Sequence, residues 1–203
     1  MIFQRLFGKK VEKEVFLIVG LGNPGRDYRL NRHNIGFRAI DCLSKSWKVT
    51  LDNVRNKALI GQGQLGEVKV ILAKPQTFMN LSGQSVAPLL RFYKIPQEKM
   101  LVIVDDLDLP LGTLRLRENG GSAGHKGMTS IIGQLGSNDF PRLRLGIGRP
   151  SGRLPVEDYV LQNFSDKEEE LLTPLLDRSV EAVEVFIKNG IKSAMTQFNG
   201  SLL

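Results

Sequence analysis

The sequence predicts an α/β fold in a single domain: a twisted mixed β-sheet flanked by helices, with a long C-terminal helix. Two observations support this prediction. Short apolar runs, of the length typical of buried strands, alternate along the chain with segments whose apolar residues recur at helical spacing. Near the C-terminus, a capping-box sequence precedes one long helical pattern. The 203 residues suffice for one well-formed core, and no repeat or linker divides them.

The N-terminal half is expected to contain a strand, a helix and a β-hairpin. Residues 15–20 form an apolar run that ends in glycine, which is typical of a buried strand. Over 35–47, apolar residues recur at helical spacing. Residues 57–64 and 68–73 predict the two strands of a hairpin that turns at 65–67.

In the middle of the chain, helical and strand patterns alternate. A helix is expected over 85–93, with Pro88 in its first turn, where a proline is tolerated. The apolar runs 101–104 and 142–147 predict two more strands, and 113–117 predicts a more exposed one.

Two further helices are expected in the C-terminal part, the first over 128–135. Ser165 and Glu168 have capping-box spacing and begin the second, long helix, which Asn189–Gly190 is expected to close. Pro174 is expected either to kink this helix or to mark its true start.

The composition is that of an ordinary globular protein, 41% hydrophobic and 24% charged. No apolar stretch approaches the roughly 20 residues that cross a bilayer. Residues 1–14 predict a flexible basic tail ahead of a domain over 15–203. The single cysteine, Cys42, lies in a helical apolar pattern, which favours a reducing compartment, so we expect a cytoplasmic protein. One cysteine and two histidines make a zinc cluster implausible, and we expect no metal and no cofactor.

The net charge of +7 and the pI near 9.6 indicate an acidic partner, such as nucleic acid or a membrane surface, although solubility alone would also explain them. Six arginines lie in two short segments that flank a glycine-rich loop: Arg115, Arg117, Arg142, Arg144, Arg149 and Arg153. Arg142 and Arg144 share strand parity and should lie on one face. We therefore expect positive charge to be concentrated near that loop.

Both histidines lie in polar loop sequence, where they suit proton transfer near neutral pH or, alternatively, helix capping. We expect His33 to be a general base and Asp105, at the end of a strand, to orient it. Asp106 is expected to be solvated and Asp108 to shape a turn. No serine or cysteine has the context of a nucleophile, so a His–Asp pair indicates direct activation of water.

Residues 20–25, Gly-Leu-Gly-Asn-Pro-Gly, match the GxGxxG pattern of dinucleotide sites. The Pro-Gly pair predicts a turn that delays the helix, so a nucleotide-dependent oxidoreductase is the weakest hypothesis. The preferred interpretation is that these glycines place the Asn23 amide in a cleft, where Asn80 would supply a second amide. Alternatively, both asparagines serve only to form turns. Phe78 and Met79 suit either the core or a cleft wall. The loop Gly120–Gly127 suits either a phosphate cradle or a mobile lid.

Six motifs, in order from about Phe16 to about Asn199, closely resemble the bacterial-type peptidyl-tRNA hydrolase family. They are Ile18–Gly25, Tyr28 with Arg32–Asn34, Lys74–Gly83, Asp105–Pro110, Gly120–Gly127 and Arg142–Gly148. The resemblance implies a monomeric, metal-independent enzyme that acts without a membrane. Its partner would be peptidyl-tRNA released from stalled ribosomes, and it would hydrolyse the ester between the peptide and the terminal ribose.

The resemblance also implies roles for individual residues. His33 corresponds to the general base, Asp105 to its partner, and Asn23 and Asn80 to the amides of the catalytic group. The expected substrate-binding residues are Tyr28, Phe78, Met79, His125 and Lys126. The expected contacts to tRNA phosphates are Arg117, Arg144 and Arg149.

One position departs from the family pattern. Many members have an asparagine where this chain has Lys126, so the role of this position is open. A chloroplast relative of the family serves as an intron-splicing cofactor, and a non-catalytic RNA-binding module is therefore the alternative hypothesis. The presence of His33, Asp105, Asn23 and Asn80 favours the enzyme.

Overall fold

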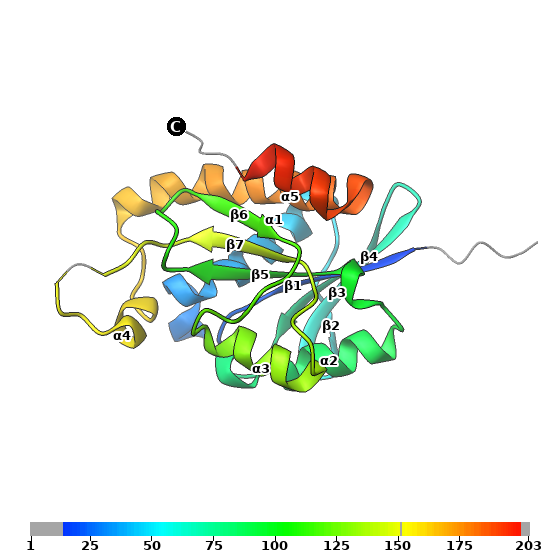
Figure 1. Ribbon diagram of the computed structural model, residues 1–203, viewed down its shortest axis with the longest axis horizontal. Helices are drawn as coiled ribbons and strands as arrows, with labels where there is room; N and C mark the ends of the chain where they lie inside the picture. The colour runs from blue at the N-terminus through cyan, green and yellow to red at the C-terminus, as the bar shows by residue number, and fades with distance from the viewer. Residues whose placement is uncertain (1–13, 151, 200–203) are drawn as a thin grey trace, which may run out of the picture.

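The computed structural model describes residues 14–150 and 152–199. The expected basic tail lies outside the described residues except for its last one. The described part forms a mixed seven-stranded β-sheet with helices on both faces (Figure 1). The prediction of a single α/β domain with a mixed sheet and a long C-terminal helix is confirmed.

The strands lie in the order β2-β3-β4-β1-β5-β7-β6 across the sheet. They are β1 (Val15–Gly20), β2 (Asn53–Arg55), β3 (Ala58–Leu65), β4 (Val68–Pro75), β5 (Met100–Asp106), β6 (Leu114–Arg117) and β7 (Arg142–Gly146). The central strands β4, β1, β5 and β7 are parallel, whereas β2 and β3 on one side and β6 on the other pair antiparallel. Because the carboxyl ends of parallel strands meet at one edge, the loops after β1, β4 and β5 converge.

Most strand ends differ from the sequence-based prediction by one or two residues, and two differences matter for the fold and the site. β2 is an extra edge strand, which the pattern misses because it has only three residues and no apolar run; Val54 is exposed. β5 extends beyond the expected 101–104 as far as Asp106, so that Asp105 lies within the strand itself.

The longer helices are α1 (Ile35–Trp47), α2 (Gly83–Phe92), α3 (Lys126–Leu135), α4 (Val156–Val160) and α5 (Asp166–Phe198). The 3-10 turns are η1 (Arg26–Tyr28), η2 (Arg32–Asn34), η3 (Met79–Leu81) and η4 (Gln97–Lys99). Alternate residues of β1 face two cores: Phe16 and Ile18 pack with α1 and α5, and Leu17 and Val19 with α2 and α3 (Figure 1). Burial on both faces explains why β1 is apolar throughout. None of the helices in the described ranges is long and apolar enough to span a membrane.

Pro88, expected in the first turn of α2, lies in its second turn, because the helix begins earlier, at Gly83. Gly83 opens it, with its N–H donating to Ser130 Oγ of α3 at 3.0 Å. A Cβ at Gly83 would lie 2.2 Å from the carbonyl oxygen of Ser130, so the two helices approach closely there. Pro88 deprives only Gln84 of a helical partner, and Gln84 is exposed to water.

The start of α5 confirms the predicted capping box. Ser165 is the N-cap, and its backbone N–H donates to Glu168 Oε2 at 2.8 Å. Both oxygens of Glu168 also accept hydrogen bonds from Arg32 of η2, at 2.8 and 2.9 Å. These bonds lower the pKa of Glu168 to about 2. The cap therefore also ties α5 to the loop that carries His33.

The expected end of the long helix at Asn189–Gly190 is confirmed. Gly190 has φ of 81° and non-helical geometry, so the long helix stops there, and a second helical segment follows across the kink to Phe198; the label α5 spans both. Pro174 lies inside α5 and does not mark its start, and Gly190 is the residue of this helix whose φ and ψ are non-helical. Beyond the kink, Asn199 pairs with the edge strand β6: the backbone N–H of Leu116 donates to Asn199 Oδ1 at 2.6 Å, and Asn199 Nδ2 donates to the Leu116 carbonyl at 3.0 Å.

Candidate active site

A cleft of about 1260 Å³ opens where the loops after β1, β4 and β5 converge. Most of the residues singled out from the sequence line it: Asn23, His33, Phe78, Met79, Asn80, Asp105, Arg117, His125, Lys126, Arg144 and Arg149. Tyr28 is not among the lining residues, although its ring meets that of Phe78 edge-on at 6.4 Å. Asn80 is exposed on η3. Residues spread over more than 120 positions of the sequence thus share one cavity.

At the centre of the cleft, His33 Nδ1 lies 2.9 Å from Asp105 Oδ1. Both side chains are largely buried, with exposed fractions of 12% and 3%. Because a carboxylate only accepts hydrogen bonds, Nδ1 carries the proton and Nε2 keeps a lone pair. Burial lowers the pKa of His33, but the charge of Asp105 and this hydrogen bond outweigh burial and raise it above its ordinary value, against a small opposing effect of Lys126. Although burial of Asp105 opposes its ionisation, the two imidazoles, His33 and His125, hold its pKa far below the usual range.

Close backbone packing sets the position of His33. α1 begins two residues after it and lies directly against β1. A Cβ at Gly20 would be 2.1 Å from the Gly36 carbonyl oxygen, and a Cβ at Gly36 would be 2.5 Å from the Ile103 carbonyl oxygen. Only glycine at both positions permits this approach, which brings the loop after β1 next to the end of β5.

Asn23 is fixed by its neighbours. Its backbone N–H donates to Asn34 Oδ1 and its carbonyl accepts from Asn34 Nδ2, both at 2.9 Å. Its side-chain Oδ1 accepts the backbone N–H of Met79 at 2.8 Å. The Nδ2 group therefore remains as the donor that Asn23 can offer to the cleft. Asn34 has no assigned role in the sequence prediction; its place beside His33 in a polar tripeptide is the only signal that could have found it.

The GxGxxG loop lacks the geometry of a dinucleotide site. Gly25 has φ of 111° and is followed by the 3-10 turn η1, and α1 begins only at Ile35. No helix N-terminus therefore follows the last glycine of the pattern, which is where a pyrophosphate would bind.

His125 contacts Asp105 as well. Its Nε2 lies 3.1 Å from the same oxygen, Oδ1, that meets His33. Its Nδ1 accepts the backbone N–H groups of Gly127 and Met128, at 3.1 and 3.2 Å, and so caps α3. These two amides are also ones that a phosphate cradle would use, which weakens that interpretation of the glycine-rich loop.

His33, Asp105 and His125 offer nitrogen and oxygen atoms within 4.8 Å of one another, close enough to hold a metal ion. The hydrogen bonds do not fit this use. Because His125 Nδ1 accepts two backbone N–H groups, its proton is on Nε2, which then has no lone pair for a metal.

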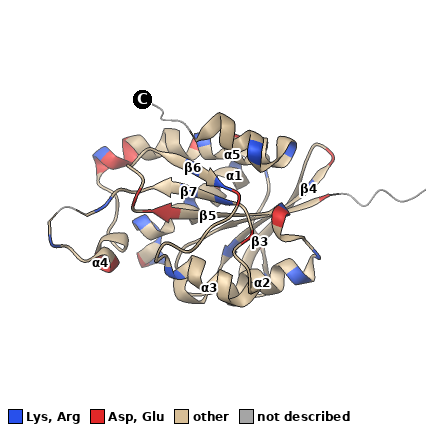
Figure 2. Ribbon diagram, viewed as in Figure 1, with Lys and Arg blue, Asp and Glu red and all other residues tan. Residues whose placement is uncertain are grey.

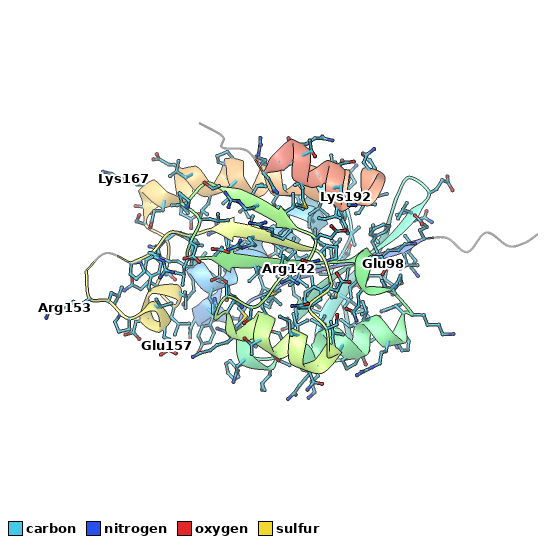
Figure 3. The ribbon with its side chains drawn as sticks, in the orientation of Figure 1. Glu98, Arg142, Arg153, Glu157, Lys167 and Lys192 are labelled. Carbon is cyan, nitrogen blue, oxygen red and sulfur yellow. The ribbon has the colours of Figure 1, made fainter. Side chains whose placement is uncertain are left out.

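Arg142, labelled in Figure 3, holds the glycine-rich loop. Its guanidinium donates to the carbonyls of Gly120 and Gly121, and to those of Asn138 and Phe140. Burial, with the nearby charge of Arg144, lowers the pKa of Arg142 to about 10. This clamp is missed by sequence reasoning, because strand parity gives Arg142 and Arg144 the same face but does not show that only Arg142 is buried.

The two acidic residues after Asp105 differ from expectation. Asp106, expected to be solvated, is nearly buried and accepts a hydrogen bond from Arg144 Nε. Its Oδ1 also accepts the backbone N–H of Asp108 at 2.8 Å, so Asp106 shapes the turn that was expected of Asp108. Asp108 is instead exposed and pairs with Arg149, whose Nε lies 3.0 Å from Oδ1.

The expected concentration of positive charge is weaker than the sequence suggests. Five lysine and arginine residues line the cleft, but so do four acidic ones. Lys126 Nζ, for example, lies 2.7 Å from Glu157 Oε1 of α4. Figure 2 shows basic and acidic residues interspersed over the ribbon. Within the described ranges, Arg117 is the cleft arginine at the surface for which the structure records no ion pair.

The family model for peptidyl-tRNA hydrolase matches residues 17–202. The chain belongs to the peptidyl-tRNA hydrolase family. A peptidyl-tRNA hydrolase of Chloroflexus aggregans is 51% identical over 186 residues, which cover 91% of this chain and 99% of that protein. A chloroplastic peptidyl-tRNA hydrolase of Arabidopsis thaliana is 49% identical over 185 residues, covering 91% of this chain but 64% of that longer protein.

The fold agrees with this assignment. The crystal structure of a peptidyl-tRNA hydrolase from Acinetobacter baumannii superimposes with a TM-score of 0.86 at 38% sequence identity, covering 92% of this chain and 95% of that one. The resemblance inferred from the six motifs is thus confirmed at the level of the family and of its fold.

Proposed function

We propose that this protein hydrolyses the ester bond between a peptide and the terminal ribose of tRNA, and so recycles peptidyl-tRNA released from stalled ribosomes. Membership of the peptidyl-tRNA hydrolase family supports the substrate. The observation that carries the proposal is the 2.9 Å contact between His33 Nδ1 and Asp105 Oδ1, which leaves Nε2 as a base in a cleft lined by amides.

The reaction needs no group beyond these side chains and water. His33 Nε2 takes a proton from water as the water oxygen attacks the ester carbonyl carbon, and Asp105 stabilises the resulting imidazolium. The oxyanion of the tetrahedral intermediate accepts hydrogen bonds from Asn23 Nδ2 and from the Asn80 amide. The intermediate then collapses: the bond to the ribose oxygen breaks, and that oxygen takes the proton back from His33.

The walls of the cleft support two recognition roles. Phe78 and Met79 form an apolar side that suits the peptide; Phe78 is exposed and Met79 is buried. Tyr28 contributes only through its edge-on contact with the Phe78 ring. Arg117, Arg144 and Arg149 would contact tRNA phosphates at the other side. The ion pairs of Arg144 and Arg149 would have to open or be shared for such contacts.

The test of the function is incubation of the purified protein with an N-blocked aminoacyl-tRNA, following release of the blocked amino acid. Release under multiple turnover supports the enzyme. Binding of the tRNA without release would favour the alternative, a non-catalytic RNA-binding relative of the same fold. Failure to bind or hydrolyse would contradict both.

We also propose that the protein works as a monomer, away from membranes, in a reducing compartment such as the cytoplasm. Coverage of the β6 edge by α5 and Asn199 supports the monomer. The single cysteine, Cys42, supports a reducing compartment. The chloroplastic relative makes an organelle of similar redox state the other location to examine.

Replacing Arg117 with glutamine is expected to weaken tRNA binding several-fold. Arg117 lacks a recorded acidic partner in the described ranges, so its charge is free to meet a phosphate. Each phosphate contact contributes about 0.7 to 0.9 to the slope of log K against log salt, and the variant should lose about that much. Lys192→Gln removes the same charge from α5, on the opposite face of the sheet (Figure 3), and should leave the slope unchanged. Equal losses in the two variants would indicate a general charge effect.

Replacing Lys126 with asparagine is expected to reduce affinity for full-length tRNA, most clearly at low salt. The ion pair with Glu157 joins two side chains that are 60% and 74% exposed, and such pairs are weak enough to open for a phosphate. Glu157→Gln is the matched control: it frees Lys126 and should strengthen binding.

Two other results would revise the role of Lys126. Unchanged tRNA affinity with an acid limb of the pH–rate profile shifted to higher pH would mean that Lys126 acts on His33, whose pKa its charge lowers. No change in either quantity would make Lys126 a solvated loop residue.

A further inference from the structure

We propose that His125 is a positioning residue of the reaction. Its Nε2–H holds the Asp105 carboxylate, and the first turn of α3 holds the His125 ring in place. The proposal rests on the proposed function, since it concerns the same His33–Asp105 pair. It differs from the substrate-binding role expected from the sequence.

The tautomer of His125 follows from its contacts. Gly127 and Met128 both direct backbone N–H groups at Nδ1, so a proton on Nδ1 would face two donors at 3.1 and 3.2 Å. Nδ1 therefore accepts and carries no proton, and the ring proton is on Nε2. The one N–H of His125 is thus committed to Asp105, and no donor or acceptor atom of the ring remains for substrate.

Local packing holds the His125 ring against this bond. A Cβ at Gly127 would lie 3.0 Å from His125 Cε1 and 2.6 Å from Met79 Sδ, so the absence of a side chain there allows the ring to lie close to the helix. Gly124, with φ of 79°, turns the preceding backbone toward α3. The ring centroids of His33 and His125 lie 4.9 Å apart, and both rings contact Asp105 Oδ1.

Asp105 Oδ1 is shared by the two histidines, and this sharing affects the pKa of His33. Asp105 Oδ1 accepts from both histidines, so part of its negative charge is directed at His125 rather than at His33. The other charged group that acts on His33 is Lys126, which is itself paired with Glu157. Without the bond from His125, Asp105 would stabilise protonated His33 more strongly. The pKa of His33 would rise, so on acidification His33 would become protonated, and stop acting as a base, at a higher pH. Asp105 would also be free to rotate away from the orientation that His33 requires.

His125→Asn separates this role from helix capping. Asparagine is a good N-cap, so its Oδ1 can take over the Gly127 and Met128 amides, but its side chain is too short to replace Nε2 at Asp105. The chain has only two histidines, so the single imidazole signal left in proton NMR belongs to His33. We expect its titration midpoint to rise by at least about half a unit, and the acid limb of kcat/KM to rise with it. His125→Ser caps the helix in the same way and should give the same shift.

Thr129→Ala is the matched control, because Thr129 Oγ1 contacts the His125 carbonyl at 3.2 Å without touching Asp105. It should leave the His33 titration unchanged. An unchanged His33 midpoint in both folded His125 variants would overturn the proposal, and a raised KM with an unmoved acid limb would return His125 to substrate binding. The NMR titration needs no turnover: a shifted midpoint in a protein without hydrolase activity would contradict the proposed function but not the positioning role.

Discussion

His33→Ala is expected to lower kcat by at least about a hundredfold, because general-base assistance contributes roughly 10²–10⁴-fold to rate. The fold should survive the change. Asp105 keeps its hydrogen bond from His125, so the buried carboxylate is not left without a donor. The measurement is release of the blocked amino acid at saturating substrate, with thermal unfolding followed alongside.

Near wild-type turnover in the His33 variant would exclude this residue as the base. If His33→Ala lost turnover and also unfolded at a lower temperature, the alanine variant alone would not separate loss of the base from loss of the fold. His33→Gln then decides, because its amide can still donate to Asp105 but cannot act as a base at neutral pH.

Asp105→Asn is expected to reduce kcat on the order of 10⁴-fold, similar to the loss seen when the carboxylate of a His–Asp pair becomes an amide. An amide cannot stabilise the imidazolium, and its N–H can donate to His33 Nδ1, which moves the ring proton to Nε2 where the lone pair is needed. The residual activity should also have a different pH profile. The charge of Asp105 raises the pKa of His33 whereas burial lowers it, so the acid limb should move to lower pH.

The neighbouring carboxylate provides the control for this experiment. Asp106→Asn removes a charge one residue away that is paired with Arg144 and does not contact either histidine. We expect it to leave the acid limb in place. An acid limb that moves equally in both variants would show that His33 responds to the overall charge of the cleft and not to the hydrogen bond from Asp105. Asp105→Asn and His125→Asn, in contrast, should move the limb in opposite directions.

The sequence predicts six of the seven strands in the described ranges because each is a local apolar pattern, and the pairing of His33 with Asp105 then follows from the topology. An apolar run that ends in a polar residue indicates a buried strand and its exit, and parallel topology then brings the exits of β1 and β5 together. The C-terminal segment is less predictable. Gly190 ends the long helix as its sequence context predicts, but the second helical segment beyond it is not predicted; residues of that segment, including Ala194 and Phe198, are buried in the core.

The parts of the site that sequence reasoning misplaces depend on long-range partners. A sequence does not distinguish a free cation from a paired one, so it predicts that Arg144, Arg149 and Lys126 are all available for phosphate. In the structure each has an acidic partner: Asp106, Asp108 and Glu157, respectively. The role of His125 is hidden for a similar reason. Its polar context indicates chemistry, but only the fold reveals that one nitrogen caps a helix and the other contacts Asp105.

The contact between β1 and α1 limits how this protein can be engineered. Replacing glycines in helices with alanine is a common route to thermostability. Gly36, in the first turn of α1, would be an obvious target, but a methyl group there would collide with the Ile103 carbonyl, two residues before Asp105. Relief of that collision would push α1 and the adjacent His33 away from β5. Variants selected for heat resistance should therefore accept alanine elsewhere on the helices but keep glycine at position 36. The close contact of α1 with β5 at Gly36 also sets the distance between His33 and Asp105, on which the transfer of the water proton depends.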